Sequence, residues 1–199
     1  MKAILVISVI LCIAAFGCMI AAFVVAGNPR YDGYADGFYY DYIEYGNIEG
    51  ISLSGCDLVG EIKIPSEIDG KPVLTTGSSW WGDEPVSFFA NPEEVLSVTL
   101  PDTLQEIGDG MFKDCMRLEQ ATIPNRVTQI GRFAFSGCTR LKRIVIPENV
   151  KYIGNGAFED CSSLTIYAEV ASKPSGWSEL EYGYPSWNGD CPVVWGYKG

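Results

Sequence analysis

Cysteine is the residue type in this chain whose spacing most resembles a chemical site. Cys115, Cys138 and Cys161 recur at intervals of 23 residues, and four further cysteines lie at positions 12, 18, 56 and 191. The sequence contains no Cys-x-x-Cys pair, so neither a structural zinc site nor a dithiol redox centre is indicated. We therefore predict that the three regularly spaced cysteines are small, buried, apolar residues.

Other catalytic groups are also scarce. The 199 residues include no histidine, which removes Ser-His-Asp and Cys-His nucleophile systems and histidine-ligated metals. Phosphate-binding loops, G-x-S-x-G turns and calcium-binding loops are absent as well. The acidic pairs Asp83-Glu84 and Glu93-Glu94 could imitate a carboxylate acid–base pair, but solvated surface charge is the simpler interpretation. We expect no catalytic residue, metal or cofactor.

The charge balance is acidic, with 25 Asp and Glu against 14 Lys and Arg and a net charge of -11. This balance argues against nucleic acid as a partner, because affinity for phosphate backbones comes mainly from Lys and Arg. Residues 113–151 are an exception, with eight basic and three acidic residues. This segment could steer an anionic partner, although ordinary solubility charge also accounts for it.

The amino-terminal stretch Ala3–Ala26 carries no charged residue. As a helix it would be about 36 Å long, enough to cross a hydrocarbon core of about 30 Å. It is either a retained membrane anchor or a signal peptide cleaved between Ala26 and Gly27. Lys2 precedes it and mostly acidic residues follow, so the positive-inside rule places the remaining chain outside the cytoplasm. The expected location is the cell membrane with an extracytoplasmic domain, or secretion after cleavage.

A repeat of 23 residues runs through the middle of the chain without gaps. Its copies are 95–117, 118–140 and 141–163, and a fourth begins at Leu164. Apolar residues recur at positions 1, 4, 6, 10 and 13, proline at 7, glycine at 14, phenylalanine at 18 and cysteine at 21. Such a period is typical of a solenoid in which each copy forms one short coil and equivalent side chains stack.

Each part of the unit has a physical interpretation. Positions 3–6 alternate and are rich in β-branched residues, which predicts a short strand that the following proline ends. The glycines at position 14 (Gly108, Gly131 and Gly154) would supply permissive dihedral angles at a corner. Phenylalanine and cysteine, three residues apart, fit one 3₁₀ turn facing inward. The rings predicted to stack inside the coils are Phe112, Phe135 and Phe158.

The unit, written Lxx(I/A)xIPxxVxxIGxxAFxxC, resembles the BspA-like, Treponema-type leucine-rich repeat. The match is close in all three copies, with Met111 in place of alanine as the main departure. Residues 60–77 resemble a wider first repeat of that family, whereas 78–94 depart from it. The resemblance implies a leucine-rich repeat protein exposed at a cell surface that binds proteins, with adhesion to host or neighbouring-cell proteins as the expected role.

The fold prediction is an α/β, right-handed leucine-rich repeat solenoid of about four to five coils. One side carries a parallel β-ladder, the other carries short strands or 3₁₀ turns, and caps cover both exposed ends. A transmembrane or signal helix precedes it. The expected segments are an anchor or signal peptide at 1–27, a stalk and capping hairpin at 28–59, a degenerate first repeat with an insertion at 60–94, three regular repeats at 95–163 and a Trp-rich cap at 164–199.

Strand alternation places positions 3 and 5 of each copy on the solvent side of the ladder. The candidate protein-binding face therefore consists of Ser97, Thr99, Gln120, Thr122, Arg143 and Val145, with Arg117, Arg140 and Lys142 at its edge. The alternative hypothesis is a carbohydrate-binding or envelope-associated structural protein. It would stack sugar rings on exposed indoles of Trp80, Trp81, Trp177 or Trp187. Exposure of those indoles separates the two hypotheses.

Overall fold

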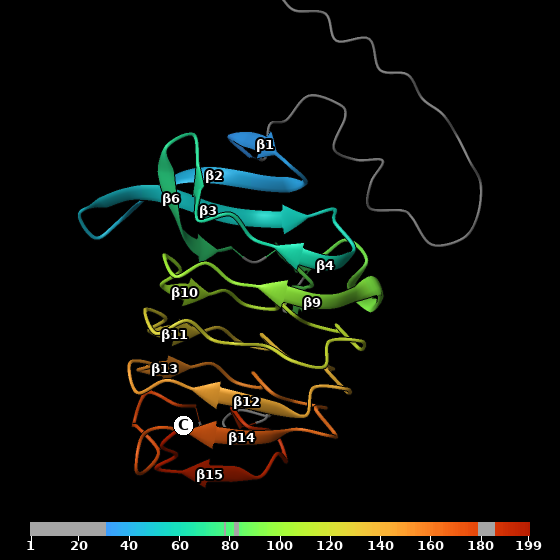
Figure 1. Ribbon diagram of the computed structural model, residues 1–199, viewed down its shortest axis with the longest axis vertical. Helices are drawn as coiled ribbons and strands as arrows, with labels where there is room; N and C mark the ends of the chain where they lie inside the picture. The colour runs from blue at the N-terminus through green and yellow to red at the C-terminus, as the bar shows by residue number, and fades with distance from the viewer. Residues whose placement is uncertain (1–30, 78, 82–83, 179–185) are drawn as a thin grey trace, which may run out of the picture. The chain divides into compact units, whose positions relative to one another are not determined.

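The chain beyond its amino-terminal segment folds as coils stacked along one axis (Figure 1). The structure, a computed structural model, describes residues 31–77, 79–81, 84–178 and 186–199. The predicted anchor or signal helix at Ala3–Ala26 lies outside these residues. Within the described ranges, no helix combines the length and the apolar character needed to cross a membrane.

Two parallel ladders run along the stack, one on each side of the coils. The first ladder is formed by positions 3–6 of the repeat and by equivalent segments at both ends. Its strands are β4 (Gly60–Lys63), β9 (Val95–Thr99), β12 (Arg143–Ile146), β14 (Thr165–Ala168) and β15 (Val193–Trp195). Strand β4 pairs with β9, and β12, β14 and β15 pair in that order.

The second ladder comes from the residues before the repeat glycine. Its strands are β6 (Lys71–Thr76), β10 (Glu106–Ile107), β11 (Gln129–Ile130) and β13 (Tyr152–Ile153). All of them pair in parallel, in chain order. The isoleucine of each of the last three strands is fully buried, as the repeat pattern predicts.

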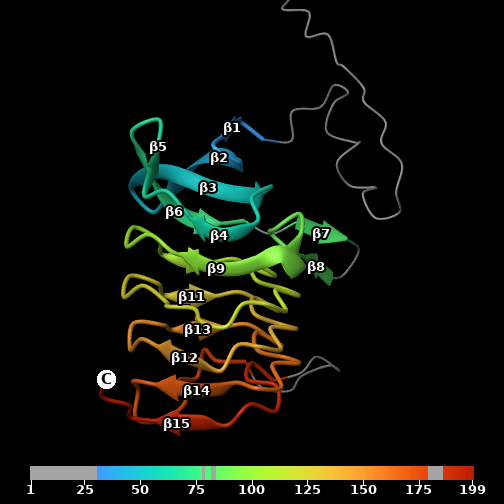
Figure 2. The same ribbon diagram turned by 45° about the vertical axis from the view of Figure 1, so that its right-hand side comes forward.

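Short antiparallel strands complete the amino-terminal end of the stack. They are β1 (Gly33–Ala35), β2 (Phe38–Tyr45), β3 (Ile48–Cys56) and β5 (Glu67–Ile68). Strands β2 and β3 form a hairpin, and β3 pairs in parallel with β6, which joins the hairpin to the second ladder. Strands β7 (Ser79–Trp81) and β8 (Glu84–Val86) form a separate small hairpin beside the coils (Figure 2).

Two parts of the fold prediction are wrong. The solenoid has about six coils rather than four to five, because β15 adds one more rung beyond the copy that begins at Leu164. The α/β class is also wrong for the described residues, which contain no α-helix and one 3₁₀ helix, Pro92–Glu94. The Phe-x-x-Cys segments are single turns closed by bonds such as Cys138 N–H to the Phe135 carbonyl, 3.2 Å.

The repeat phenylalanines stack in one column through the middle of the solenoid. The ring centroids of Phe112 and Phe135 are 4.7 Å apart, those of Phe135 and Phe158 are 5.2 Å apart, and the planes are nearly parallel. Phe89 packs on one end of the column and Trp187 on the other. These ring–ring contacts stabilise the association of neighbouring coils, in addition to the stabilisation that comes from the apolar area the rings bury.

The repeat glycines have a role other than the predicted one. Gly108, Gly131 and Gly154 do not adopt positive φ angles; within each copy, positions 16 and 20 do so instead. A Cβ at Gly154 would lie 2.6 Å from the backbone nitrogen of Arg132 in the preceding coil, and Gly108 and Gly131 are equally crowded. Glycine is required here because two backbones approach each other closely.

The buried cysteines form a second column beside the rings. Cys138 Sγ donates to the carbonyl oxygen of Phe112, and Cys161 Sγ to that of Phe135, each at 3.1 Å. Cys191 Sγ makes a longer contact of the same kind with Phe158. The thiols of Cys138, Cys161 and Cys191 each bond to a backbone carbonyl one coil away, which suits a small apolar residue that can also donate.

These thiols are expected to be unreactive in the native protein. Burial raises the pKa of Cys56 to about 11 and also raises the pKa of Cys115. A shift of two units lowers the thiolate fraction about 100-fold at pH 8. With Cys12 and Cys18 replaced by serine, an aromatic disulfide reagent should label none of the five remaining cysteines within an hour, and all of them in urea. Mass-spectrometric detection of a Cys115–Cys138 or Cys138–Cys161 disulfide in native protein would contradict this expectation.

Candidate interaction surface

The solvent side of the first ladder, which we call the strand face, presents the side chains that alternation predicts. Ser97 and Thr99 on β9 are exposed, and so are Gln120, Thr122 and Arg143. The apolar residues between them point inward, with Val98 and Ile144 buried in the core. Val145 is the exception on this face, since its side chain is only partly exposed.

The ladder beneath the strand face is interrupted at residues 120–123. This segment should lie between β9 and β12, but its pairing there is an isolated bridge between Gln120 and Arg143. Its sequence is Gln-Ala-Thr-Ile, so Ala121 stands where the other copies have Val98 and Ile144. Alanine fills less of the core and favours a strand less than valine or isoleucine does. The strand face is therefore formed by two separate sheets, and the segment between them pairs with β12 only through this bridge.

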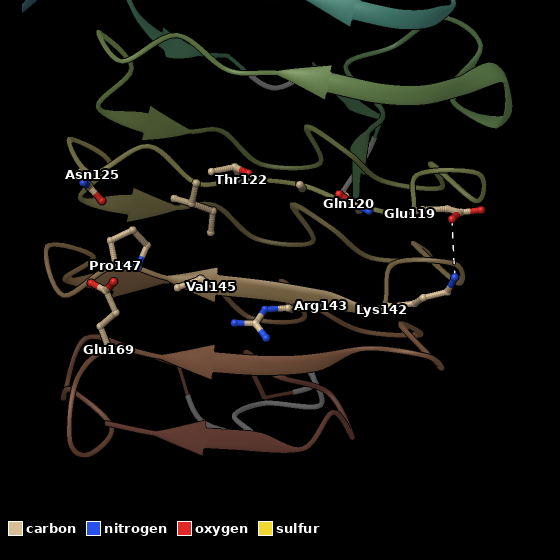
Figure 3. Close-up of a pocket in the computed structure, with 11 residues that line it drawn as sticks. Glu119, Gln120, Thr122, Asn125, Lys142, Arg143, Val145, Pro147 and Glu169 are labelled. Atoms are coloured by element: carbon tan, nitrogen blue, oxygen red, sulfur yellow. Dashed lines mark ion pairs between the residues drawn. The ribbon is translucent and has the colours of Figure 1, made fainter. Parts of the chain in front are cut away.

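Two neighbouring hollows lie along this interruption. The central hollow has a volume of about 480 Å³ and lies between the coils of residues 120 and 143 (Figure 3). The arginine hollow, of about 360 Å³, lies nearer the start of the strands. They share Glu119 and Gln120. The predicted face residues that line one or both are Ser97, Arg117, Gln120, Thr122, Arg140, Lys142, Arg143 and Val145, so only Thr99 lines neither.

Arg143 is held in place by two tyrosine rings. Its guanidinium carbon is 4.1 Å from the ring centroid of Tyr167 on β14 and 4.8 Å from that of Tyr197, which follows β15. The two rings contact each other edge to face with centroids 5.1 Å apart. A cation over an aromatic ring is stabilised by about 0.5–1 kcal/mol at an exposed site. Because the two rings already restrict the guanidinium, binding a ligand would cost this side chain less conformational entropy.

The charges at the edge of the hollows are mixed in sign. Lys142 Nζ is 3.6 Å from Glu119 Oε2 in an exposed ion pair, which Figure 3 shows at the end of the central hollow. Glu169, at the opposite end, accepts a hydrogen bond of 3.1 Å from the backbone N–H of Glu148. Arg143 thus has no carboxylate partner among the described residues, and its charge remains directed to solvent.

The sequence pattern did not identify several residues of this surface, notably Tyr167 and Tyr197. Tyr167 pairs with Val145 and occupies the outward position of the fourth strand. Extending the alternation into residues 165–168 with an offset of one residue would have found it. Tyr197 lies beyond the repeats, where no periodic signal exists.

The indole prediction is wrong for two of its four residues. Trp177 and Trp187 are 1% and 2% exposed and pack against each other and against Trp195, so neither can stack on a sugar ring. The side chains of Trp80 and Trp81 lie outside the described part of the structure. Among the acidic pairs, Glu93 and Glu94 are exposed on the 3₁₀ helix, and Asp83 lies outside the described residues.

Comparison with known proteins identifies the repeat. The family model described as BspA type Leucine rich repeat region matches residues 85–172, in six copies. A leucine-rich repeat protein of T. pallidum is 24% identical, with 79% of each chain covered and a TM-score of 0.51, and it shares the fold. A leucine-rich repeat protein from Bacteroides ovatus is 23% identical over 81% of this chain and 46% of its own, with a TM-score of 0.48.

A third solved structure, a leucine-rich cell surface protein from Faecalibacterium prausnitzii, is 20% identical over 83% of this chain and 44% of its own, with a TM-score of 0.46. No curated protein matches the sequence. The 23-residue period, the stacked phenylalanine column and the family match agree with one another. Residues 85–172 therefore match the BspA-type leucine-rich repeat family in sequence and in fold.

Proposed function

We propose that the chain is a non-catalytic module that binds another protein through its strand face and is displayed outside the cell. One observation carries the proposal: the central and arginine hollows both lie on the face that alternation predicted from the sequence. Leucine-rich repeat domains in general mediate protein–protein interaction, in agreement with the family of residues 85–172.

Two sequence features support the non-catalytic role and the location. The chain has no histidine and none of the common nucleophile motifs, which favours recognition over catalysis. The uncharged segment Ala3–Ala26 after Lys2 favours export with the repeats on the outer side of the membrane. Adhesion to a protein of a host or neighbouring cell is the role that these features support together.

The experiment is a binding screen with the full-length protein, kept in solution by a mild detergent because of its apolar amino-terminal segment. Extracellular-matrix proteins and cell-wall polysaccharides are immobilised side by side, and binding is measured by interferometry. Saturable binding to a protein supports the proposal. Binding to polysaccharides alone, sensitive to Trp80→Ala and insensitive to changes on the strand face, would overturn it.

Arg143→Glu should weaken binding of the protein partner by about tenfold or more, because an ordered cation near the centre of the contact is replaced by an anion. Lys151→Glu is the matched control. It reverses the same charge, but Lys151 lines neither hollow and its ammonium donates to the Glu148 carbonyl in its own turn. The affinity of this control should change less than twofold, and an equal loss in both variants would point to a general charge effect.

A further inference from the structure

We propose that Arg117 and Arg140 form a clamp for a carboxylate group of an acidic peptide segment in the protein partner. This inference rests on the proposed function, since it names the chemistry that the strand face would recognise. The clamp is the arginine hollow, which both side chains line together with Ser97 and Gln120.

The repeat places Arg117 and Arg140 at equivalent positions of neighbouring coils, and both line one hollow. Arg117 and Arg140 both occupy the last position of their copies, in consecutive coils. The bridge between Gln120 and Arg143 shows that these coils are in register, with residues 23 apart facing each other. Neighbouring parallel chains are about 4.8 Å apart. Two planar donors that start this close together can converge on one carboxylate.

Both arginines have their charge available. Their side chains are exposed, and among the described residues neither forms an ion pair. Glu119, the acidic residue that lines the same hollow, is already paired with Lys142. Two like charges at equivalent turn positions of adjacent coils repel each other. An anion bound between them would relieve this repulsion.

The surroundings favour a peptide over a dense polyanion. Leu96, 39% exposed, lines the arginine hollow, and Met116, 49% exposed, directly precedes Arg117 in the chain. Ser97 and Gln120 add neutral groups that can donate to or accept from a peptide backbone. The carboxylate of Glu169, at the edge of the central hollow, would repel a closely sulfated chain. An aspartate or glutamate next to an aliphatic residue matches this mixture.

The test uses the full-length protein in detergent micelles and two synthetic peptides, acetyl-Gly-Asp-Leu-Gly-amide and its neutral twin with Asn in place of Asp. The arginine Nε–Hε signals are followed by NMR during each titration. The acidic peptide should shift the signals of Arg117 and Arg140 saturably, with a Kd of about 1–10 mM. The Asn peptide should bind at least fivefold more weakly, and raising NaCl from about 20 to 200 mM should weaken the acidic peptide further.

The double variant Arg117→Gln/Arg140→Gln should lose the effect, whereas Arg126→Gln/Lys151→Gln, with the same loss of charge outside both hollows, should keep it. Shifts confined to the Nε–Hε signal of Arg143 would overturn the clamp while leaving the strand face as the binding surface. Saturation by a heparin-derived oligosaccharide but not by the acidic peptide would overturn it in favour of a polysaccharide. The interferometric screen with Arg143→Glu judges the proposed function separately.

Discussion

Phe135→Ala is expected to lower the free energy of unfolding by about 3–5 kcal/mol, the range for removing a large ring from a tight core. Phe135 is fully buried and is the middle ring of the column, stacked on Phe112 at 4.7 Å and on Phe158 at 5.2 Å. The coils of Phe112 and Phe158 each contribute a strand to both ladders. They cannot close the cavity without shifting backbone.

Urea unfolding followed by circular dichroism measures this loss. Phe133→Ala, two residues away, is the matched control, because its ring is only partly buried and lies outside the stack. Its cost should be about 1 kcal/mol or less. Since each coil of a solenoid contacts only its neighbours, the loss of the central ring should also broaden the unfolding transition. Equal midpoints for Phe135→Ala and the parent would show that the column does not hold the coils together.

The interior of the repeats could be predicted from the sequence because a gapless period assigns every residue of one copy to the position of its equivalents. The buried phenylalanines and the buried isoleucines of the second ladder all follow from that alignment. The outward residues of β9 and β12, such as Ser97 and Arg143, follow from alternation within each strand. These predictions require only the alignment of each repeat copy with the adjacent copies.

The hollows could not be predicted, because they arise where one rung of the first ladder pairs through a single bridge only. Residues 120–123 have the correct alternation, and the effect of Ala121 on pairing depends on how closely the adjacent coils pack. The register beyond the third repeat copy could not be predicted either. The repeat copy 141–163 pairs with the next copy through Arg143 and Thr165, which are 22 residues apart instead of 23. This offset concealed the outward position of Tyr167.

The misassigned glycines show the same limit. Glycine at a corner suggests an unusual dihedral angle, because that is the property visible within a single copy. The positive φ angles instead fall at residues such as Asp114, Phe133 and Gly137. The requirement for glycine at position 14 comes from the neighbouring coil, so a single copy contains no sign of it.

Gly131→Ala should therefore destabilise the protein although alanine suits the local backbone. The added Cβ would lie 2.6 Å from the carbonyl carbon of Gly108 and closer still to the backbone nitrogen of Asp109. Neither is a flexible side chain, so the two coils must separate. The same approach supports the bond from Gly131 N–H to the Ile107 carbonyl, 2.8 Å, which continues the second ladder. We expect a loss of about 3 kcal/mol, at the upper end of overpacking costs.

Gly55→Ala is the control that separates crowding from chain entropy. Gly55 lies in β3, has no positive φ angle, and an added Cβ would meet Tyr39 at an ordinary 3.5 Å. This variant should be unchanged or more stable by about 0.5–1 kcal/mol, because alanine restricts the unfolded chain. Both variants are compared with the parent by urea unfolding. If Gly131→Ala were as stable as Gly55→Ala, the coils would be able to separate at little cost, and the close backbone approach would not be what requires glycine at this position of the repeat.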